Sequence, residues 1–459
     1  MLPPRFATLL EPGAPAWRLA DRFDAGGFQL YLVGGSVRDV LRRKEHFDLD
    51  FATDARPPDI KAALSGWADD VFTLGEAFGT IGALHDGERF EITTFRREVY
   101  RDDSRKPVVA FSADIETDLS RRDFTVNALA LRVLDPEMID PCGGLADIHR
   151  GVLRTPLGPE ISFGDDPLRM LRLYRFASTL GFEPDAATEE AVTRMRERLR
   201  IVSAERIRDE LSKLMAGEHV GDGLRGLVRS GLADEFLPEL PAMALEQDPL
   251  HRHKDVLAHT IAVVEKCPAD DEVVRLAGLL HDIGKPATRS FEDGGVSFHH
   301  HEAVGARMAR ERLHALRYPK QVVEDVAQLV FLHMRPHTYK MGWTDRAVRR
   351  YVRDAGRLLE QLNTLVRCDV TTRNPRRAEA VQRRIDELES RIAELAEQEE
   401  LDRLRPSIDG NQVMAPLGID PGPVVGEIMD LLLEHRIDEG PYSEEEAYRL
   451  VDEWWAARR

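Results

Sequence analysis

The chain of 459 residues is poor in cysteine and has no long apolar run. Its cysteines, Cys142, Cys267 and Cys368, lie far apart and in no metal-binding spacing, which argues against a disulfide framework and indicates a reducing compartment. No apolar stretch reaches the ~18 residues of a membrane span. Residues 1–22 lack the apolar core of a signal peptide. We therefore expect a cytoplasmic protein with no membrane contact.

Positive charge is also in deficit, since the net charge is −18 with 31% charged and 42% hydrophobic residues. That composition is typical of a globular protein rich in amphipathic helix, and the length predicts roughly two to four domains. An RNA-binding chain with this balance must cluster its basic residues. Three arginine clusters qualify: Arg169, Arg172 and Arg175; Arg194, Arg196, Arg198, Arg200, Arg206 and Arg208; and Arg349, Arg350, Arg353, Arg373, Arg376 and Arg377. Any one of them can equally be a solvated helix face.

The most informative segment joins a glycine turn to an acidic strand. Gly34 and Gly35 follow an apolar run, and Asp48 and Asp50 stand in a strand expected over residues 46–52. Residues i and i+2 of a strand face the same way, roughly 6.6 Å apart, which suits carboxylates sharing two divalent cations. Glycines let backbone N–H groups approach a triphosphate. The pattern favours nucleotidyl transfer over an exposed acidic strand without function.

Glu91 is the candidate third carboxylate. It belongs to a hairpin expected over residues 79–95, on a strand predicted to pair near Asp48 and Asp50. There it completes the metal cage or takes the proton of the attacking hydroxyl. The alternative is a surface glutamate on an edge strand. Residues 97–113 are charged and aperiodic, and we expect a loop.

Two arginines and a polar pair form the next motif. Arg121 and Arg122 suit bidentate binding of phosphates. Asp123 and Asn127 lie one turn apart on an expected apolar helix, so they face the same way and need polar partners. A ribose or a metal shell would supply those partners.

Asp166 and Arg169 lie one turn apart at the start of a helix that Asp166 caps. Arg172 and Arg175 continue the same spacing. A carboxylate accepts from an exocyclic amine, and a guanidinium donates to a ring nitrogen. Cytosine and adenine present that combination, whereas uracil and guanine present a carbonyl beside an N–H. The pair predicts selection of CTP and ATP, with helix capping and solvated arginines as the alternative.

A second site is predicted within the helical residues 251–370. Two histidines and two carboxylates there suit a divalent metal with open positions for water. These ligands are His259, His281, Asp282 and Asp369. His301 and His333 are candidate ligands for a second ion. The sequence leaves open whether this site is active and which metal it takes.

Taken in order, these motifs resemble those of the tRNA nucleotidyltransferase (CCA-adding enzyme) and bacterial poly(A) polymerase family. Residues 251–370 resemble the HD phosphohydrolase domain that some members carry, and the resemblance is closest to the HD-containing bacterial type. Asp165 stands where the family often has glutamate. The other matching segments are residues 32–39, 48–53, 121–130, 165–177, 409–411 and 421–423.

The resemblance implies that Asp48 and Asp50 bind two Mg²⁺ and that Glu91 assists. It implies attack of a tRNA 3′-hydroxyl on the α-phosphorus of CTP or ATP, with release of pyrophosphate. The implied nucleotide ligands are Gly34, Gly35, Ser36 and Arg38 for the triphosphate, Arg122, Asp123 and Asn127 for ribose and phosphate, and Asp166, Arg169, Arg172 and Arg175 for the base. Members that add only CC are shorter in the loop after the third carboxylate, so residues 97–113 favour addition of all three nucleotides.

We expect an α+β chain whose nucleotidyltransferase head contains a mixed five-stranded sheet. An all-α neck and body, a helical HD domain and a helical tail would come after it. The expected boundaries are 1–155 for the head, 156–245 for the neck and body, 246–375 for the HD domain and 376–459 for the tail. The partners are tRNA, CTP and ATP, and the oligomeric state stays open. A poly(A) polymerase and an HD phosphohydrolase acting on nucleotide or RNA phosphates remain the alternatives.

Overall fold

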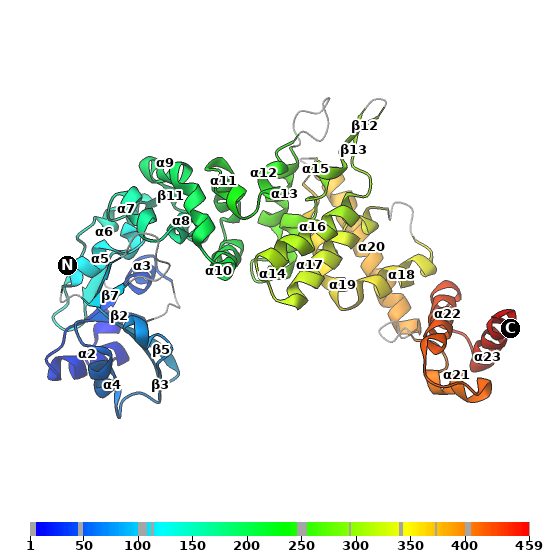
Figure 1. Cartoon of the computed structure of the whole chain (residues 1–459), viewed down its shortest axis with the longest axis horizontal. Helices are drawn as coiled ribbons and strands as arrows, with labels where there is room; N and C mark the ends of the chain where they lie inside the picture. The colour runs from blue at the N-terminus through cyan, green and yellow to red at the C-terminus, as the bar shows by residue number, and fades with distance from the viewer. Residues whose placement is uncertain are drawn as a thin grey trace. The chain divides into compact units, whose positions relative to one another are not determined.

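The computed structural model folds as two compact units, Met1–Pro241 and Ala242–Arg459 (Figure 1). It describes residues 6–44, 49–99, 108–111, 114–245, 255–292, 295–338, 343–371, 374–399 and 405–458. The first unit carries a β-sheet and the helices that follow it, and the second is built mainly from helices. Within these ranges no helix has both the length and the apolar content to cross a membrane.

The sheet of the first unit has seven strands among the described residues, in the order β3–β4–β5–β2–β1–β8–β9. Their bounds are β1 Leu30–Val33, β2 Leu49–Thr53, β3 Asp70–Phe72, β4 Thr80–His85, β5 Glu88–Thr94, β8 Ala130–Arg132 and β9 Met138–Ile139. Strands β2 and β5 are parallel and the other neighbours antiparallel, which confirms the mixed sheet. The expected count of five was too low, because the edge strands β3 and β9 have only three and two residues. Such short strands show no alternating pattern.

Both faces of the sheet are covered. Leu30 and Leu32 of β1 pack into a core that includes Leu19 of α2 (Pro15–Ala25) and Ile60 of α4 (Pro57–Leu64). The intervening Tyr31 belongs to a second core with Leu119 of α5 (Ile115–Ser120) on the other face. The central strands are therefore rigidly held, and side chains at their ends are placed by packing on both sides.

Two segments of the first unit differ from the sequence-based expectation. Residues 97–113 contain the paired strands β6 (Arg96–Val99) and β7 (Val108–Phe111), and residues 100–107 and 112–113 lie outside the described residues. The high charge of this segment hides the strand pattern. Residues 123–130 form the short 3-10 turn η3 (Thr125–Asn127) and then enter β8, because their apolar residues complete the sheet beside β1. By contrast, the β4–β5 hairpin forms as predicted, with φ of +52° at Asp86 and +80° at Gly87.

The rest of the first unit is a set of helices around α8. Their bounds are α7 Pro159–Asp165, α8 Leu168–Leu180, α9 Ala186–Met195, η4 Arg196–Ile201, α10 Ala204–Met215, α11 Val220–Arg229 and α12 Glu239–Ala242. Helix α8 packs against α10 and α11, and Gly226 of α11 lies directly on the Tyr174 ring of α8. Asp166 accepts the Leu168 N–H at 3.1 Å, so the predicted capping of α8 is confirmed.

The second unit is a helical bundle followed by a small helical tail. The bounds are α13 Val256–Lys266, α14 Glu272–Leu280, α15 Lys285–Thr288, β12 Ser290–Glu292, β13 Gly295–Ser297, α16 His301–Ala315, α17 Lys320–Leu332, α18 Asp345–Ala355, α19 Leu359–Cys368, α20 Pro375–Glu399, α21 Gly410–Leu417, α22 Pro423–Glu439 and α23 Glu444–Arg458. Helix α14 lies among α13, α17 and α19. Helix α20 is long and rich in charged residues, and α21–α23 enclose their own small core.

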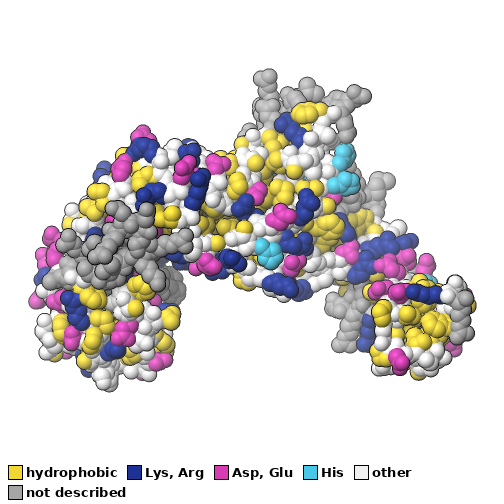
Figure 2. Space-filling model, viewed as in Figure 1, with side chains coloured by type: hydrophobic (Ala, Val, Ile, Leu, Met, Phe, Trp, Pro, Cys, Tyr) yellow, Lys and Arg dark blue, Asp and Glu magenta, His cyan; other side chains and the backbone are white. Residues whose placement is uncertain are grey.

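Two arginines of the third cluster are neutralised within the protein. Arg350 and Arg353 of α18 pair with Glu434 of α22, and Arg350 also pairs with Asp438. Figure 2 shows basic (dark blue) and acidic (magenta) side chains gathered where α18 and α22 lie in Figure 1. Arg373 lies outside the described residues. Arg350 and Arg353 therefore form a helix–helix contact, and this part of the cluster is a weaker candidate for RNA binding than the sequence indicates.

Candidate active sites

A cavity of about 1820 Å³ in the first unit gathers most of the predicted nucleotide site. Its lining includes Gly35, Ser36, Arg38, Asp50, Glu91, Arg122, Asp123, Asn127, Asp166, Arg169, Arg172 and Arg175. Gly34 lies in the turn behind the lining, and Asp48 lies outside the described residues. Residues from β2, β5, η3 and α8 thus share one cavity, although the first and the last of them lie more than 100 positions apart in the chain.

The carboxylates Asp50 and Glu91 stand directly opposite each other on the parallel strands β2 and β5. Their neighbours Phe51 and Ile92 point the other way into the core, so the period of two directs both acids into the cavity. Arg89 donates to Glu91 at 3.0 Å, an exposed pair that leaves this carboxylate solvated. The predicted pairing of the third carboxylate strand beside Asp50 is therefore present.

The glycine turn precedes α3 (Gly35–Leu41) and adopts a conformation that only glycine takes easily. Gly34 has φ +63° and ψ −123°, and a Cβ there would stand 2.5 Å from Arg122 Nη1. Ser36 Oγ accepts the backbone N–H of Asp50 at 2.9 Å. This hydrogen bond fastens the turn to the acidic strand, a role for Ser36 that sequence reasoning missed.

A chain of hydrogen bonds crosses the back of the cavity. Arg38 donates to Asn127 Oδ1, and Asn127 Nδ2 donates to Asp123 Oδ1 at 2.9 Å. Arg172 Nη2 donates to Asp123 Oδ2 at 2.5 Å. The polar pair Asp123 and Asn127 therefore finds partners within the protein, whereas sequence reasoning had assigned them to a ribose or a metal.

The buried charges along this row of hydrogen bonds are compensated by side chains of opposite charge. Burial alone would raise the pKa of Asp123, but Arg172 and the Asn127 amide hold that pKa well below its usual range. Burial, reinforced by Arg172, lowers the pKa of Arg175 to about 10. Glu210 of α10, which is buried, pairs with Arg175 at 3.0 Å. Sequence reasoning missed Glu210, although a glutamate on the apolar side of an amphipathic helix is the signal that would have indicated it.

Asp166 and Arg169 are held in place at the other end of the cavity. Asp166 Oδ2 accepts from Arg206 at 2.8 Å, in addition to the Leu168 bond at Oδ1. Arg169 donates to Ser162 Oγ at 2.9 Å and to the Arg121 carbonyl at 2.7 Å. An ionised carboxylate has about four acceptor positions, so Asp166 keeps acceptors for an exocyclic amine.

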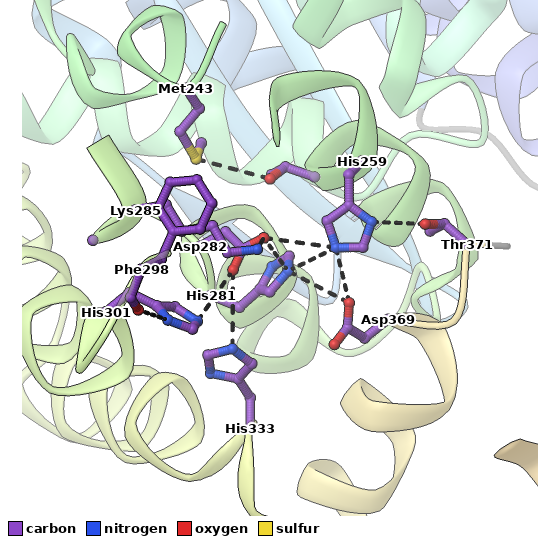
Figure 3. A network of polar contacts seen from close by, with 12 residues as sticks. Met243, His259, His281, Asp282, Lys285, Phe298, His301, His333, Asp369 and Thr371 are labelled. Carbon is purple, nitrogen blue, oxygen red and sulfur yellow. Dashed lines mark hydrogen bonds and ion pairs between the residues drawn. The ribbon is translucent and has the colours of Figure 1, made fainter. Parts of the chain in front are cut away.

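In the second unit, the four predicted metal ligands converge from three segments (Figure 3). His259 Nε2 of α13 lies 2.9 Å from Asp369 Oδ1 and 3.3 Å from His281 Nε2. His281 Nε2 lies 3.2 Å from Asp282 Oδ2. The predicted cluster is therefore confirmed as a cluster.

His301 and His333 extend the cluster on the far side of Asp282. Asp282 Oδ1 lies 3.5 Å from His301 Nε2 and 4.0 Å from His333 Nε2. Both Nε2 atoms are buried and have no hydrogen-bond partner among the described residues. The Nδ1 atoms instead contact the backbone carbonyls of Phe298 and Val330 at 2.8 and 2.6 Å, which directs Nε2 inward. The two inward-facing Nε2 atoms, which have no hydrogen-bond partner, and the Asp282 carboxylate beside them form a set of ligands that fits two divalent ions.

The electrostatics of this cluster favour cations. Burial alone would lower the pKa of His281, but Asp282 and Asp369 raise it to about 9. Burial and His281 lower the pKa of His333 to about 3, so this ring is neutral. Lys285 Nζ lies 2.7 Å from Asp282 Oδ2, so an ammonium already neutralises part of the carboxylate charge.

Three family models match the chain in sequence order. They are described as "Poly A polymerase head domain" for residues 30–154, "Probable RNA and SrmB- binding site of polymerase A" for residues 181–243 and "HD domain" for residues 255–399. The nucleotidyltransferase and HD families generally use divalent metals, in agreement with the two acidic sites.

Curated relatives give the family. An A-adding tRNA nucleotidyltransferase of Deinococcus radiodurans is 36% identical over 437 residues, which covers 92% of this chain and 95% of the relative. A CCA-adding enzyme of Bacillus pumilus is 40% identical over 227 residues, which covers 49% of this chain and 56% of that enzyme. The chain belongs to the tRNA nucleotidyltransferase family.

The fold agrees with solved structures. The Bacillus stearothermophilus CCA-adding enzyme in complex with CTP superposes with a TM-score of 0.71 at 24% identity, covering 100% of this chain and 99% of that one. The Thermotoga maritima CCA-adding enzyme complexed with tRNA has a TM-score of 0.58 at 18% identity, covering 100% and 97% of the two chains. At these identities the likeness establishes the fold alone.

Proposed function

We propose that this protein adds C, C and A to the 3′ end of tRNA, using CTP and ATP and releasing pyrophosphate. The observation that carries the proposal is the single cavity in which Asp50 and Glu91 lie opposite each other, with Asp166 and Arg169 in the same lining. The names of the relatives, A-adding and CCA-adding enzymes, support the same reaction class.

The catalytic carboxylates are Asp48, Asp50 and Glu91. Two Mg²⁺ ions held by Asp48 and Asp50 would activate the attacking hydroxyl and stabilise the leaving pyrophosphate. Ser36 keeps the Asp50 backbone in register with the glycine turn. Glu91, half-buried and solvated, is placed to accept the proton of the tRNA 3′-hydroxyl.

The triphosphate is assigned to the turn at Gly34, Gly35 and Ser36. The Gly34 N–H already donates to the Leu129 carbonyl at 3.0 Å, so contacts to phosphate oxygens would fall to the backbone N–H groups that follow it at the start of α3. Arg38 and Arg122 supply positive charge beside it. The ribose and base extend from there along the hydrogen-bonded chain of Asp123, Asn127 and Arg172.

Base selection is assigned to Asp166 and Arg169. Asp166 accepts from the exocyclic amine of cytosine or adenine, and Arg169 donates to the neighbouring ring nitrogen. The bonds of Arg169 to Ser162 and to the Arg121 carbonyl fix its guanidinium. A pair held by the protein reads one nucleotide after another without a nucleic-acid template.

We further propose that residues 1–155 form the catalytic head, 156–245 the neck and body, 246–375 the HD domain and 376–459 the tail. The family matches to residues 30–154, 181–243 and 255–399 support this division. The neck and body would bind tRNA, whose stacked helical arm is recognised by shape and phosphate contacts.

The HD cluster is proposed to hold divalent metal and to hydrolyse phosphate esters of nucleotides or RNA. Its inward Nε2 atoms and the shared Asp282 support this assignment. A metal held there would supply a hydroxide nucleophile at neutral pH.

Addition of A alone is the second candidate, because a relative that matches this chain over 92% of its length is an A-adding enzyme. The deciding experiment offers the pure protein two tRNAs, one lacking CCA and one ending in CC, with CTP and ATP together. Sequencing of the products then separates the outcomes. CCA on the first tRNA supports the proposal, whereas extension of only the second tRNA by one A establishes A addition. A long A tail would show a poly(A) polymerase.

A further inference from the structure

The order of strands in the first unit defines the direction from which the RNA terminus approaches. The glycine turn follows β1, Asp50 lies on β2, Glu91 on β5, and β4 comes next in the sheet. Nucleotidyl transfer places the attacking and leaving oxygens in line on opposite sides of phosphorus. Since the pyrophosphate lies at the glycine turn, the 3′-hydroxyl enters from the side of β5 and β4. This direction of approach rests on the proposed function.

An aromatic side chain is exposed on that side. Phe78 ends the short 3-10 turn η2 (Glu76–Phe78) directly before β4, is 53% exposed and lines the cavity. Thr80 of β4 and Thr93 of β5, its neighbours in the lining, bond each other at 2.9 Å. Phe78 precedes Thr80 by two residues, and Thr93 follows Glu91 by two. The Phe78 ring therefore belongs to the half of the cavity that carries Asp50 and Glu91.

The backbone holds Phe78 at this position. Gly79 has φ +84°, a left-handed conformation that ends η2 and turns the chain into β4. The Gly79 carbonyl accepts the Thr94 N–H at 2.9 Å, and Arg96 donates to the Phe78 carbonyl at 3.4 Å. The Phe111 ring packs on Gly79, where a Cβ would stand 2.8 Å from it. An exposed ring on an anchored turn is a preformed surface.

Phe78 differs from the other exposed apolar residues of the cavity. Among the described residues, the large exposed hydrophobics that line the cavity are Phe78, Ile161 and Ile201. Ile161 belongs to α7 and Ile201 to η4, on the half that carries Asp166. Phe78 is the aromatic member, and it alone of the three lies on the half that carries Asp50 and Glu91.

We propose that Phe78 is a stacking platform for the base of the 3′-terminal nucleotide of the RNA, a role that also rests on the proposed function. Aromatic stacking accepts every base, because each base has a flat π-face. That tolerance suits this position, since the terminal base changes with each addition while the 3′-hydroxyl must return to the same place. Hydrogen-bond readout at this point would restrict the enzyme to one of its successive primers.

The test compares Phe78→Ala with Phe72→Ala in the full-length protein. Phe72 of β3 is the matched control, because it is 42% exposed in the same unit and lies outside the lining of the cavity. Single-turnover extension is measured against the concentration of a tRNA lacking CCA and of one ending in CC. We expect Phe78→Ala to raise the KM for both RNAs by about 5- to 150-fold, the range of losing one base–aromatic stack. Phe72→Ala leaves it unchanged.

Further variants separate stacking from a structural role. Phe78→Tyr and Phe78→Trp should retain wild-type KM, whereas Phe78→Leu, which keeps apolar bulk without a π-face, should resemble Phe78→Ala. The dissociation constants of CTP and ATP without RNA should be the same in all of them by equilibrium dialysis. An RNA with 2-aminopurine as its last base should lose fluorescence on binding Phe78→Trp more than on binding wild type.

Three results have distinct meanings. Equal RNA KM values for Phe78→Ala and Phe72→Ala in an active enzyme overturn the platform and leave the proposed function intact. A raised KM for CTP and ATP with unchanged RNA KM also overturns it, because Phe78 would then contact the incoming nucleotide. An unmodified protein that extends neither RNA overturns the proposed function itself.

Discussion

Substitution of Gly34 by alanine tests the geometry of the phosphate turn most directly. The backbone at φ +63° and ψ −123° is strained for any residue with a Cβ, at about 1–3 kcal/mol. The new Cβ would also lie 2.5 Å from Arg122 Nη1 and displace a guanidinium that bonds Asp118 at 3.2 Å. Loss of a hydrogen bond between charged groups costs about 1.5–3 kcal/mol.

The strain lowers the stability of the first unit, whereas the displaced Arg122 guanidinium weakens the site itself by about 1.5–3 kcal/mol, which corresponds to roughly 10- to 150-fold in kcat/KM. The loss should fall on CTP and ATP, because this turn is the proposed triphosphate site, and the KM for tRNA should change little. Single-turnover incorporation of the first C, measured against CTP concentration, gives the change in kcat/KM for CTP.

Gly66→Ala is the matched control for backbone strain. Gly66 has φ +70°, a Cβ there would meet nothing within 4 Å, and it lies outside the lining of the cavity. The Gly66→Ala variant should lose thermal stability as Gly34→Ala does, but it should keep full activity. If Gly34→Ala and Gly66→Ala incorporate CTP equally well, the turn is not the triphosphate site and the reasoning is wrong.

Three further outcomes are expected from the two sites. Asp50→Asn should reduce incorporation of C and A by more than 1,000-fold, on the order of a lost metal ligand. Its tRNA binding, measured by filter retention, should stay within twofold of wild type (about 0.4 kcal/mol). Retained incorporation would show that Asp50 is not a metal ligand. His281→Ala should abolish metal-dependent release of phosphate from 2′,3′-cyclic nucleotides and leave CCA addition unchanged, and equal phosphate release by both proteins would contradict an active HD site. Asp123→Asn should destabilise the first unit by about 3 kcal/mol near pH 7. Because the pKa of Asp123 is depressed, its stabilisation is complete above the unfolded carboxyl pKa of about 3.9 and is lost as the pH falls below it. The difference in melting temperature between Asp123→Asn and wild type should therefore shrink below pH 4, and a difference that stays constant down to pH 2 would refute the ion pair.

Local patterns predicted the parts of the fold that depend on near neighbours. The β4–β5 hairpin follows from Asp86 and Gly87, whose positive φ values suit a two-residue turn. The capping of α8 follows from Asp166. The sequence predicted that the strand of Glu91 pairs near Asp50, and the structure adds the register that places the two residues opposite each other. The histidine cluster was predictable because an adjacent His281 and Asp282, with further histidines spaced through a helical segment, are residue types that suit a metal site.

Long-range partners were not predictable in the same way. Residues 123–130 have the apolar content of a helix. They form a turn and the start of a strand instead, because they pair with the edge of β1. Arg206 and Glu210 meet Asp166 and Arg175 across 40 and 35 positions of sequence respectively, as the ion pairs show. No local pattern encodes such contacts, since tertiary packing decides which charges face each other.

The hydrogen-bonded chain behind the cavity connects two tasks that the sequence motifs present as separate. Arg38 follows the proposed phosphate turn, and Arg172 lies on α8, which follows Asp166, the proposed base-selecting residue. Asn127 and Asp123 nevertheless join the two arginines through consecutive hydrogen bonds. Each arginine is thus oriented by the protein before a nucleotide binds, so the electrostatic site is preorganised and little rearrangement is left to the ligand. A displacement of α8 against η3 would move Arg172 and, through Asp123 and Asn127, disturb Arg38 as well. The fit of the base and the position of the triphosphate are therefore expected to change together, which lets an ill-fitting base misplace its own α-phosphorus.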